Sequence, residues 1–262
     1  MGILNTTPDS FHAASRVDSE TIATAAAAMA EAGADILDLG AESSRPGAEP
    51  IGGDEELARL LPAITAVREV CDLPLSVDTC RASTAAAALD AGVDAVNDIS
   101  AGQHDPGMFP LVARHNAGLI LMHMPGRPST MQDNPHYDDV VTEVADHLAR
   151  RASEAESAGV EGDRILVDPG IGFGKTLDHN LALLTALDRL GDGRPLVLGA
   201  SRKSFIDHLG RTSVADRLPG SLAAVAAAFQ AGVAVVRVHD VAESVQFLRV
   251  LRAISPRRTI RD

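Results

Sequence analysis

The sequence predicts a (β/α)8 barrel, a TIM barrel in which eight parallel strands close on themselves and a helix follows each strand. Three observations support this fold. The chain has 262 residues, a usual length for one such unit. Short apolar runs alternate with helix-length segments, and an Ala-Gly pair recurs where a helix gives way to the next run. An open, doubly wound sheet is the alternative that the same alternation allows.

The Ala-Gly pairs explain how each helix ends. Glycine adopts the left-handed conformation that closes a helix at little steric cost. The run after each pair is apolar without alternation, as in Leu119–Met122, which is typical of parallel strands covered on both faces. The pairs lie at Ala32-Gly33, Ala91-Gly92, Ala117-Gly118, Ala158-Gly159 and Ala231-Gly232.

The pattern divides the chain into alternating strands and helices. Strands are expected at residues 2–5, 34–40, 73–79, 94–100, 118–124, 164–169, 195–201 and 233–239. Helices are expected between them, at residues 19–32, 54–70, 81–91, 138–158, 178–190, 217–231 and 241–253. No linker or low-complexity segment interrupts the chain, so residues 1–262 are expected to form one domain.

Composition excludes several classes of partner. The formal charge is −13 and aromatic residues are only 3% of the chain, which argues against binding to nucleic acid or an anionic membrane. No apolar run approaches the roughly 18–20 residues of a membrane-spanning helix. The start of the chain turns polar too early for a signal peptide. We therefore expect a cytoplasmic protein, with Cys71 and Cys80 as free thiols.

Polar side chains follow every expected strand. In a barrel all these ends meet on the C-terminal face of the strands, where active sites lie. Acids and amides suit a ligand edge rich in N–H donors, and basic residues suit a phosphate or a carboxylate. The acidic and amide group is Asp78, Asn97 and Asp168, and the group for an anion is Asn5, Arg45, Arg202, Lys203, Arg237 and His239.

The segment Gly170–Thr176 contains a Gly-Lys-Thr sequence like that of a nucleotide-binding loop. That motif requires a glycine five residues before Gly174, and Pro169 stands there. We therefore interpret the glycines as a loop that approaches other backbone closely at a strand end.

In combination, the motifs resemble one family, dihydropteroate synthase, over almost the whole chain. The most specific are Asp168-Pro-Gly-Ile-Gly-Phe-Gly-Lys-Thr176 and Ala200-Ser-Arg-Lys-Ser-Phe-Ile206. The others follow in family order: Gly2–Asn5, Thr7–Phe11, Glu42–Ala48, Ser76–Thr79, Asn97–Ile99, Leu121–His123, Gly220–Ala224 and Arg237–Val241.

The resemblance implies a transferase of folate biosynthesis that joins a pterin pyrophosphate to 4-aminobenzoate, and it implies residue roles. Asp78, Asn97, Asp168 and Lys203 would hold the pterin, with Met122 and Phe173 lining its slot. Asn5, Arg237 and His239 would hold the pyrophosphate, and Asn5 would contact Mg2+, the implied cofactor. Ser44, Arg45 and Pro46, with Phe173, Lys203 and Ser204, would enclose aminobenzoate. Lys203, Arg237, His239 and Arg45 would be the catalytic residues. The resemblance also implies a target of sulfonamides and a homodimer.

The first loop departs from the family. After Ser10-Phe11 the usual continuation is Ser-Asp-Gly-Gly, but this chain has His12-Ala13-Ala14-Ser15, so the loop aspartate of the family is replaced by Ala13. A pterin-binding homologue without turnover is therefore an alternative. A methyltetrahydrofolate methyltransferase-type barrel is a further one, although the Ser201–Ser204 and Arg237–Asp240 segments suit aminobenzoate and pyrophosphate better.

Overall fold

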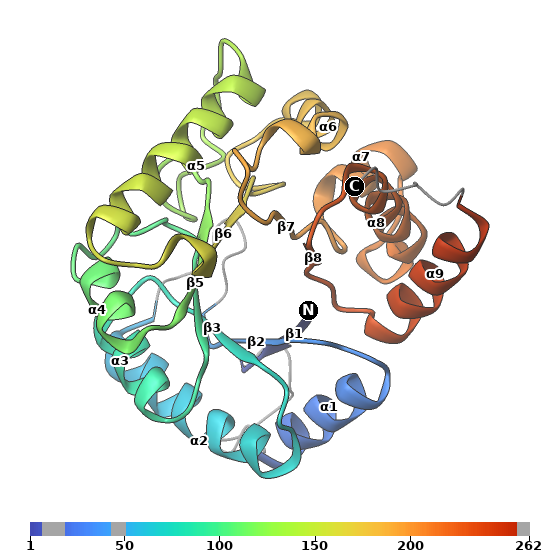
Figure 1. Ribbon diagram of the computed structural model, residues 1–262. Coiled ribbons are helices and arrows are strands. Elements are labelled where there is room, and N and C mark those ends of the chain that lie inside the picture. Colours follow the sequence, from blue (N-terminus) through green and yellow to red (C-terminus); the bar gives the residue numbers. More distant parts are fainter. Residues whose placement is uncertain (7–18, 43–50, 256–262) are drawn as a thin grey trace, which may run out of the picture.

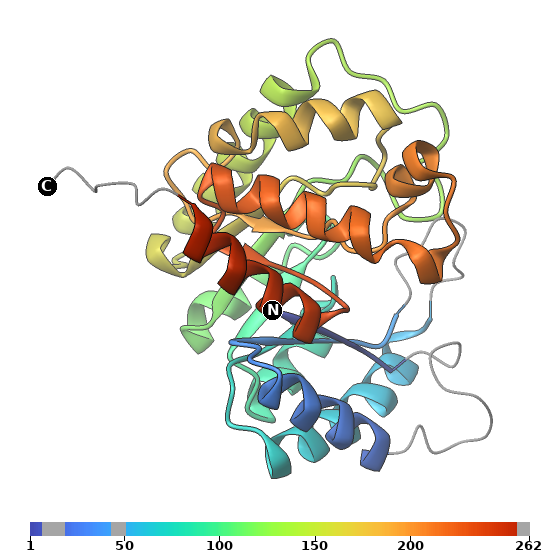
Figure 2. The ribbon, with the colours of Figure 1, turned by 90° about the vertical axis from the view of Figure 1, so that its right-hand side faces the viewer.

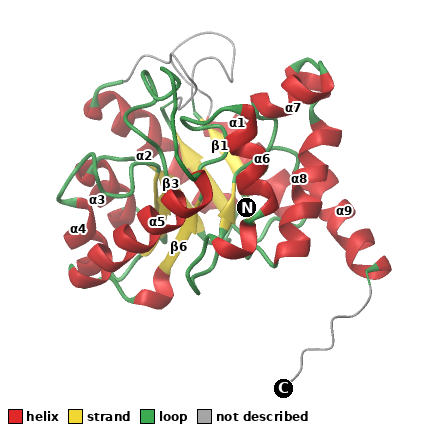
Figure 3. Ribbon diagram, turned by 90° about the horizontal axis from the view of Figure 1, so that it is seen from above, coloured by secondary structure: helices red, strands yellow, loops and turns green. Residues whose placement is uncertain are grey.

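Figure 1 shows the computed structural model, which describes residues 1–6, 19–42 and 51–255. Strands occupy the centre and helices surround them, as the view from above also shows (Figure 3). In chain order the first half contains β1 (Gly2–Asn5), α1 (Ser19–Glu31), β2 (Leu37–Gly40), α2 (Gly53–Val70), β3 (Leu75–Asp78), α3 (Ala82–Asp90), β4 (Ala95–Asp98) and α4 (Met108–His115). The second half contains β5 (Gly118–Met122), α5 (Val140–Ser157), β6 (Ile165–Asp168), α6 (Leu177–Thr185), β7 (Val197–Leu198), α7 (Ser204–Gly210), α8 (Leu218–Ala231), β8 (Val235–Val236) and α9 (Val241–Ile254).

The strands form a closed ring. Strands β1 to β6 pair in chain order, every pair parallel, and β7 pairs with β8. Two parallel bridges join the groups, one between Val167 and Leu196 and one between Gly2 and Val238. The backbone N–H of Ile3 donates to the carbonyl of Val238 at 3.0 Å across the second junction. The predicted (β/α)8 barrel is confirmed, and the open sheet is excluded.

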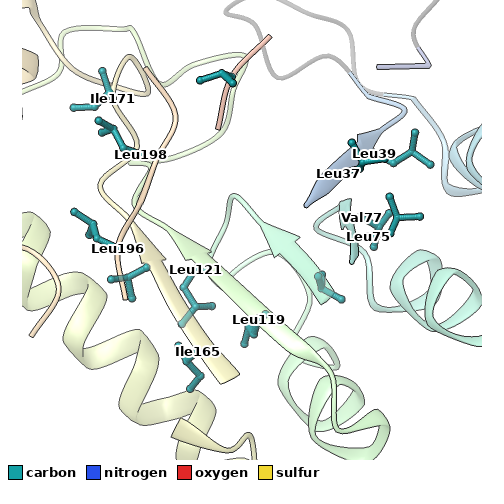
Figure 4. Packing of buried hydrophobic residues seen from close by; sticks show 14 of the residues in the cluster. Leu37, Leu39, Leu75, Val77, Leu119, Leu121, Ile165, Ile171, Leu196 and Leu198 are labelled. Carbon is teal, nitrogen blue, oxygen red and sulfur yellow. The ribbon is translucent and has the colours of Figure 1, made fainter. Parts of the chain in front are cut away.

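Alternation along the strands separates an apolar outer side from a polar interior. Leu37, Leu39, Leu75 and Val77 are at most 1% exposed and belong to the main hydrophobic core (Figure 4). Asp38 lies between the two leucines of β2, and because successive side chains of a strand point to opposite faces it faces the barrel interior. The core therefore lies between strands and helices, and the interior is free to carry polar groups.

Four of the five Ala-Gly pairs end a helix as predicted. Gly33, Gly92, Gly159 and Gly232 have φ angles between 76° and 100°. The pair at residues 117–118 was misread, because Gly118 begins β5 and Asn116, with φ 50°, provides the left-handed cap of α4. Asparagine is one of the few residues besides glycine that adopts this conformation readily.

The element boundaries differ from the predicted ones in detail. Every strand except β1 is shorter than expected, and the helix expected at residues 178–190 ends at Thr185 and continues as a short 3-10 turn. Helices α4 and α7 were missing from the expected set. Figure 2 shows α8 and α9 side by side on the outer surface. None of the helices in the described ranges could span a bilayer. That residues 1–262 form one domain stays a prediction.

Candidate active site

Strand register brings the predicted polar residues into two rows at the C-terminal end of the barrel. Asn5 pairs with Gly40, Gly40 with Asp78, and Asp78 with Asn97, so these residues form one row across β1 to β4. Met122, which ends β5, pairs with Asp168, which ends β6. Parallel pairing thus places groups that are far apart in the sequence around one opening.

Beneath the first row lies Asp38, a buried acid that sequence reasoning missed. Its side chain is completely buried. One carboxylate oxygen accepts a 2.5 Å hydrogen bond from Ser76 Oγ, and the other accepts from Arg237 Nε at 2.6 Å and from Asn97 Nδ2 at 3.2 Å. Asp38 was overlooked because it lies inside an apolar run. An acid in such a run could have indicated a polar site, because a buried carboxylate needs a partner.

Arg237 bridges two carboxylates, Asp38 beneath the first row and Asp78 within it. Its Nη2 donates to Asp78 Oδ2 at 3.0 Å while its Nε holds Asp38. Burial raises the pKa of Asp78 to about 7, and the Arg237 cation acts in the opposite direction. Burial lowers the pKa of Arg237, but Asp38 and Asp78 outweigh it and leave that pKa above its usual value. The site therefore holds a cation between two carboxylates, one of which is poised to change charge near neutral pH.

Asp168 and Lys203 form the second charged part of the site. Asp168 Oδ1 accepts from the backbone N–H of Gly170 at 2.7 Å. Burial raises the pKa of Asp168, and Lys203 opposes that shift. Burial likewise lowers the pKa of Lys203 to about 8, opposed by Asp168. The Lys203 ammonium lies 4.4 Å from the centre of the Phe173 ring and donates to the carbonyl of Ile171.

A small apolar cluster lines the space between these charges. Met122 is 4% exposed and packs with Ile99, Met124 and Met131. Phe173 and Cys80 pack against this group from outside it. A pocket of about 310 Å³ opens beside the cluster, with walls that include Asp78, Thr79, Cys80, Ile99, Ser100 and Met124. Of the residues predicted to hold the pterin, Asp78 alone lines this pocket. Apolar side chains beside a carboxylate suit a ring with N–H donors.

The remaining predicted residues are placed as follows. Ser204 is exposed and begins α7, whose N-cap is Lys203. His239 is exposed, and its Nδ1 lies 3.0 Å from Ser201 Oγ. Arg202 donates to Asp240 through Nε at 2.9 Å in a partly buried ion pair, and its place in the anion group stays a prediction. Ser44, Arg45, Pro46 and the His12–Ser15 departure lie outside the described residues.

The loop after β6 depends on a glycine that touches the end of β5. Gly170 has φ +66°, and a Cβ there would lie 2.0 Å from the carbonyl oxygen of His123. At Gly232, φ is +76° and a Cβ would meet nothing within 4 Å.

We expect Gly232→Ala to lower the free energy of unfolding by about 1–2 kcal/mol, from backbone conformation alone. Gly170→Ala should lower it by about 3 kcal/mol or more, because a clash adds to that strain. Urea unfolding of both variants measures the difference, and equal losses would contradict the close approach.

The comparisons with known proteins agree with this geometry. Residues 1–239 match the model of a family described as pterin binding enzyme. The chain belongs to the pterin-binding enzyme family. A dihydropteroate synthase from Synechocystis is 43% identical over 257 residues, which cover 97% of this chain and 89% of the relative.

Solved structures show the same similarity. The dihydropteroate synthase of Xanthomonas albilineans with 4-aminobenzoic acid has a TM-score of 0.91 and 44% identity, covering 98% of this chain and 93% of that one. The Burkholderia cenocepacia dihydropteroate synthase complexed with 7,8-dihydropteroate has a TM-score of 0.88 and 44% identity, covering 97% and 90%. With this similarity along both chains, the protein is a transferase of the dihydropteroate synthase type.

Proposed function

We propose that this chain condenses 6-hydroxymethyl-7,8-dihydropterin pyrophosphate with 4-aminobenzoate to give 7,8-dihydropteroate and pyrophosphate in folate biosynthesis. The observation that carries the proposal is the convergence of Asp78, Asn97 and Asp168 beside the apolar wall of Met122 and Phe173. A fused pterin ring presents N–H donors along one edge and two flat faces. Carboxylates can accept from the edge, and the apolar side chains can cover the faces.

The cations of the site suit the anionic parts of the substrates. Arg237 holds Asp38 and Asp78 through Nε and Nη2, and we assign Nη1 to the pyrophosphate together with His239 and Asn5. The ammonium of Lys203 lies 4.4 Å from the centre of the Phe173 ring and interacts electrostatically with Asp168, and we assign it to both the pterin and aminobenzoate. Ser204, as the first residue of α7, is assigned to the aminobenzoate carboxylate with Ser44, Arg45 and Pro46.

The reaction then follows from charge placement. The bond between the exocyclic CH2 carbon and oxygen of the pterin breaks, and pyrophosphate leaves with the electron pair. The arylamine nitrogen, which is uncharged at neutral pH, forms the new C–N bond and loses a proton. Arg237 and Lys203 stabilise the charge that develops on and around the leaving group, which preorganised cations do efficiently in a water-poor site. Positioning of the two substrates supplies the rest of the rate enhancement.

Mg2+ is the cofactor that we propose, with Asn5 as its protein ligand. A Cβ at Gly40 would lie 3.7 Å from Asn5 Oδ1, so the glycine leaves space beside that oxygen. Mg2+ usually keeps several waters and takes few protein ligands beside phosphates. Within the described ranges no three His, Cys, Asp or Glu residues gather as a metal cage, and one amide oxygen fits that mode of binding. When bound, the ion would neutralise charge on the pyrophosphate.

A homodimer and a cytoplasmic location remain part of the proposal. On α9, Val250 is 55% and Ile254 is 74% exposed, which gives an outer apolar surface away from the strand ends. On α8, by contrast, Ala224, Val225 and Ala228 are buried in the core.

Pyrophosphate release with Mg2+, measured with and without 4-aminobenzoate, tests the proposed reaction. We expect release that depends on aminobenzoate and yields dihydropteroate. Tight pterin binding without release would instead support the binding homologue that the Ala13 substitution suggests. In that case Ala13→Asp is the informative variant, because recovery of turnover would assign the defect to the first loop. Loss of release without Mg2+ would support the cofactor.

A further inference from the structure

The lysine of the Gly-Lys-Thr sequence has no role in the site described above. The chain contains only two lysines, Lys175 and Lys203. Lys175 is 4% exposed, so its ammonium is directed into the protein and cannot bind a phosphate in the way of a nucleotide loop. Next to it, the Thr176 side chain caps α6 and forms a capping box with His179.

Lys175 makes three hydrogen bonds, and all three acceptors are uncharged. Its Nζ lies 3.0 Å from His123 Nδ1, 3.3 Å from the His123 carbonyl and 2.9 Å from the Phe173 carbonyl. Burial, followed by the Lys175 cation, lowers the pKa of His123 to about 2, so this ring is neutral. Its Nδ1 accepts from Lys175 in the tautomer that carries the ring proton on Nε2. An ammonium has three donors, and these contacts use each of them.

These bonds join two active-site walls. His123 follows β5 immediately after Met122, and Phe173 lies in the loop after β6. Three successive carbonyls of that loop accept from side chains: Gly172 from Gln132 at 2.8 Å, Phe173 from Lys175, and Gly174 from Tyr137 at 2.9 Å. Of the three donors, only Lys175 is buried. Burial lowers the pKa of Lys175 to about 7, and its protonated form makes the stronger, charge-assisted hydrogen bonds.

We propose that Lys175 is a positioning residue, which fixes the Phe173 backbone so that the Phe173 ring lies between the pterin slot and Lys203. The role rests on the proposed function, because the ring is assigned there to both substrates. Close packing supports it: a Cβ at Gly174 would lie 2.2 Å from Pro125 Cγ, so the loop lies directly on the segment after β5. Without Lys175 the Phe173 carbonyl loses its donor, and the ring is free to move.

Lys175→Met, which keeps side-chain length and removes the donors, tests this role. We expect kcat/KM for aminobenzoate to fall at least about tenfold, up to about 100-fold, as for a misplacement of about 1 Å. Gln132→Ala, which removes the exposed donor to the neighbouring carbonyl, is the matched control and should cost less. If the wild-type enzyme is active and Lys175→Met keeps the same kcat/KM, the inference is overturned. If the wild-type enzyme is inactive, the proposed function is overturned instead.

A double-mutant cycle separates positioning from a general loss of structure. If Lys175 acts through the ring, Lys175→Met should add little to the loss already caused by Phe173→Leu. Fully additive losses would contradict the role.

The unmodified protein provides a measurement that does not depend on a folded variant. Labelling with 15N-lysine gives two side-chain signals, one for each lysine. Slow exchange of the Lys175 Nζ protons with water is expected from the three bonds, and exchange as fast as that of free lysine would refute them.

Discussion

Asp168→Asn is expected to lower kcat/KM for the pterin substrate roughly ten- to 150-fold, as for the loss of a hydrogen bond to a charged group. The amide oxygen of asparagine can still accept from the backbone N–H of Gly170, which Asp168 Oδ1 now does at 2.7 Å. The local fold should therefore survive. The other oxygen becomes an NH2 group, so an acceptor for a pterin N–H turns into a donor beside Lys203.

Pterin binding by calorimetry and steady-state kinetics measure this effect. Asp163→Asn is a matched control, because Asp163 is exposed at the opposite end of the same strand, before β6 begins. That control should keep the wild-type kcat/KM. An Asp168→Asn enzyme with unchanged affinity and rate would remove Asp168 from the pterin site.

Arg237→Met is expected to cause the largest loss of stability, about 3–5 kcal/mol, because it leaves a buried carboxylate without its partner. Asp38 is completely buried and bound to Arg237. In the same variant Asp78 loses the cation that opposes its raised pKa. That pKa should rise further above about 7, so any remaining pterin binding should weaken at neutral pH and recover as pH increases.

Urea unfolding of Arg237→Met and of the double variant with Asp38→Asn measures the coupling. Neutralising Asp38 as well should recover part of the lost stability, since Asp38 then carries no uncompensated charge. Arg164→Met is the control, because Arg164 and its partner Glu161 are 40% and 61% exposed. An exposed pair is worth at most about 1 kcal/mol. If Arg237→Met also lost no more than about 1 kcal/mol, the stability of buried Asp38 would not depend on Arg237.

The sequence predicted the barrel because its evidence is local. Apolar runs such as Leu119–Met122 and helix-ending glycines such as Gly33 are visible over a few residues. The exact ends of the elements were less predictable, since a strand ends where its hydrogen bonds to neighbours end. The pair at residues 117–118 shows the limit of composition, because Asn116, not the glycine, turned out to close the helix.

The residues of the candidate site were predicted through motifs at strand ends, but the hydrogen bonds and ion pairs between them were not. Asp78, Asn97 and Asp168 were found because polar residues stand out after apolar runs. Asp38 was missed inside such a run, because its partner Arg237 lies far away in the sequence. The ion pair between Arg202 and Asp240 was likewise not visible in the sequence, because it joins two different strand ends.

By itself, the sequence determined the fold class, the family and the chemical character of the strand ends, because periodicity, glycine placement and motif order are properties of the chain. The tertiary structure decided which charges compensate one another and which groups surround each lysine. Lys175 and Lys203 are the same residue type, but Lys175 is 4% exposed and bound to neutral acceptors, whereas Lys203 lies over the Phe173 ring and interacts electrostatically with Asp168. The reason is physical: burial and distance set the free energy of a charge, and only folding assigns them.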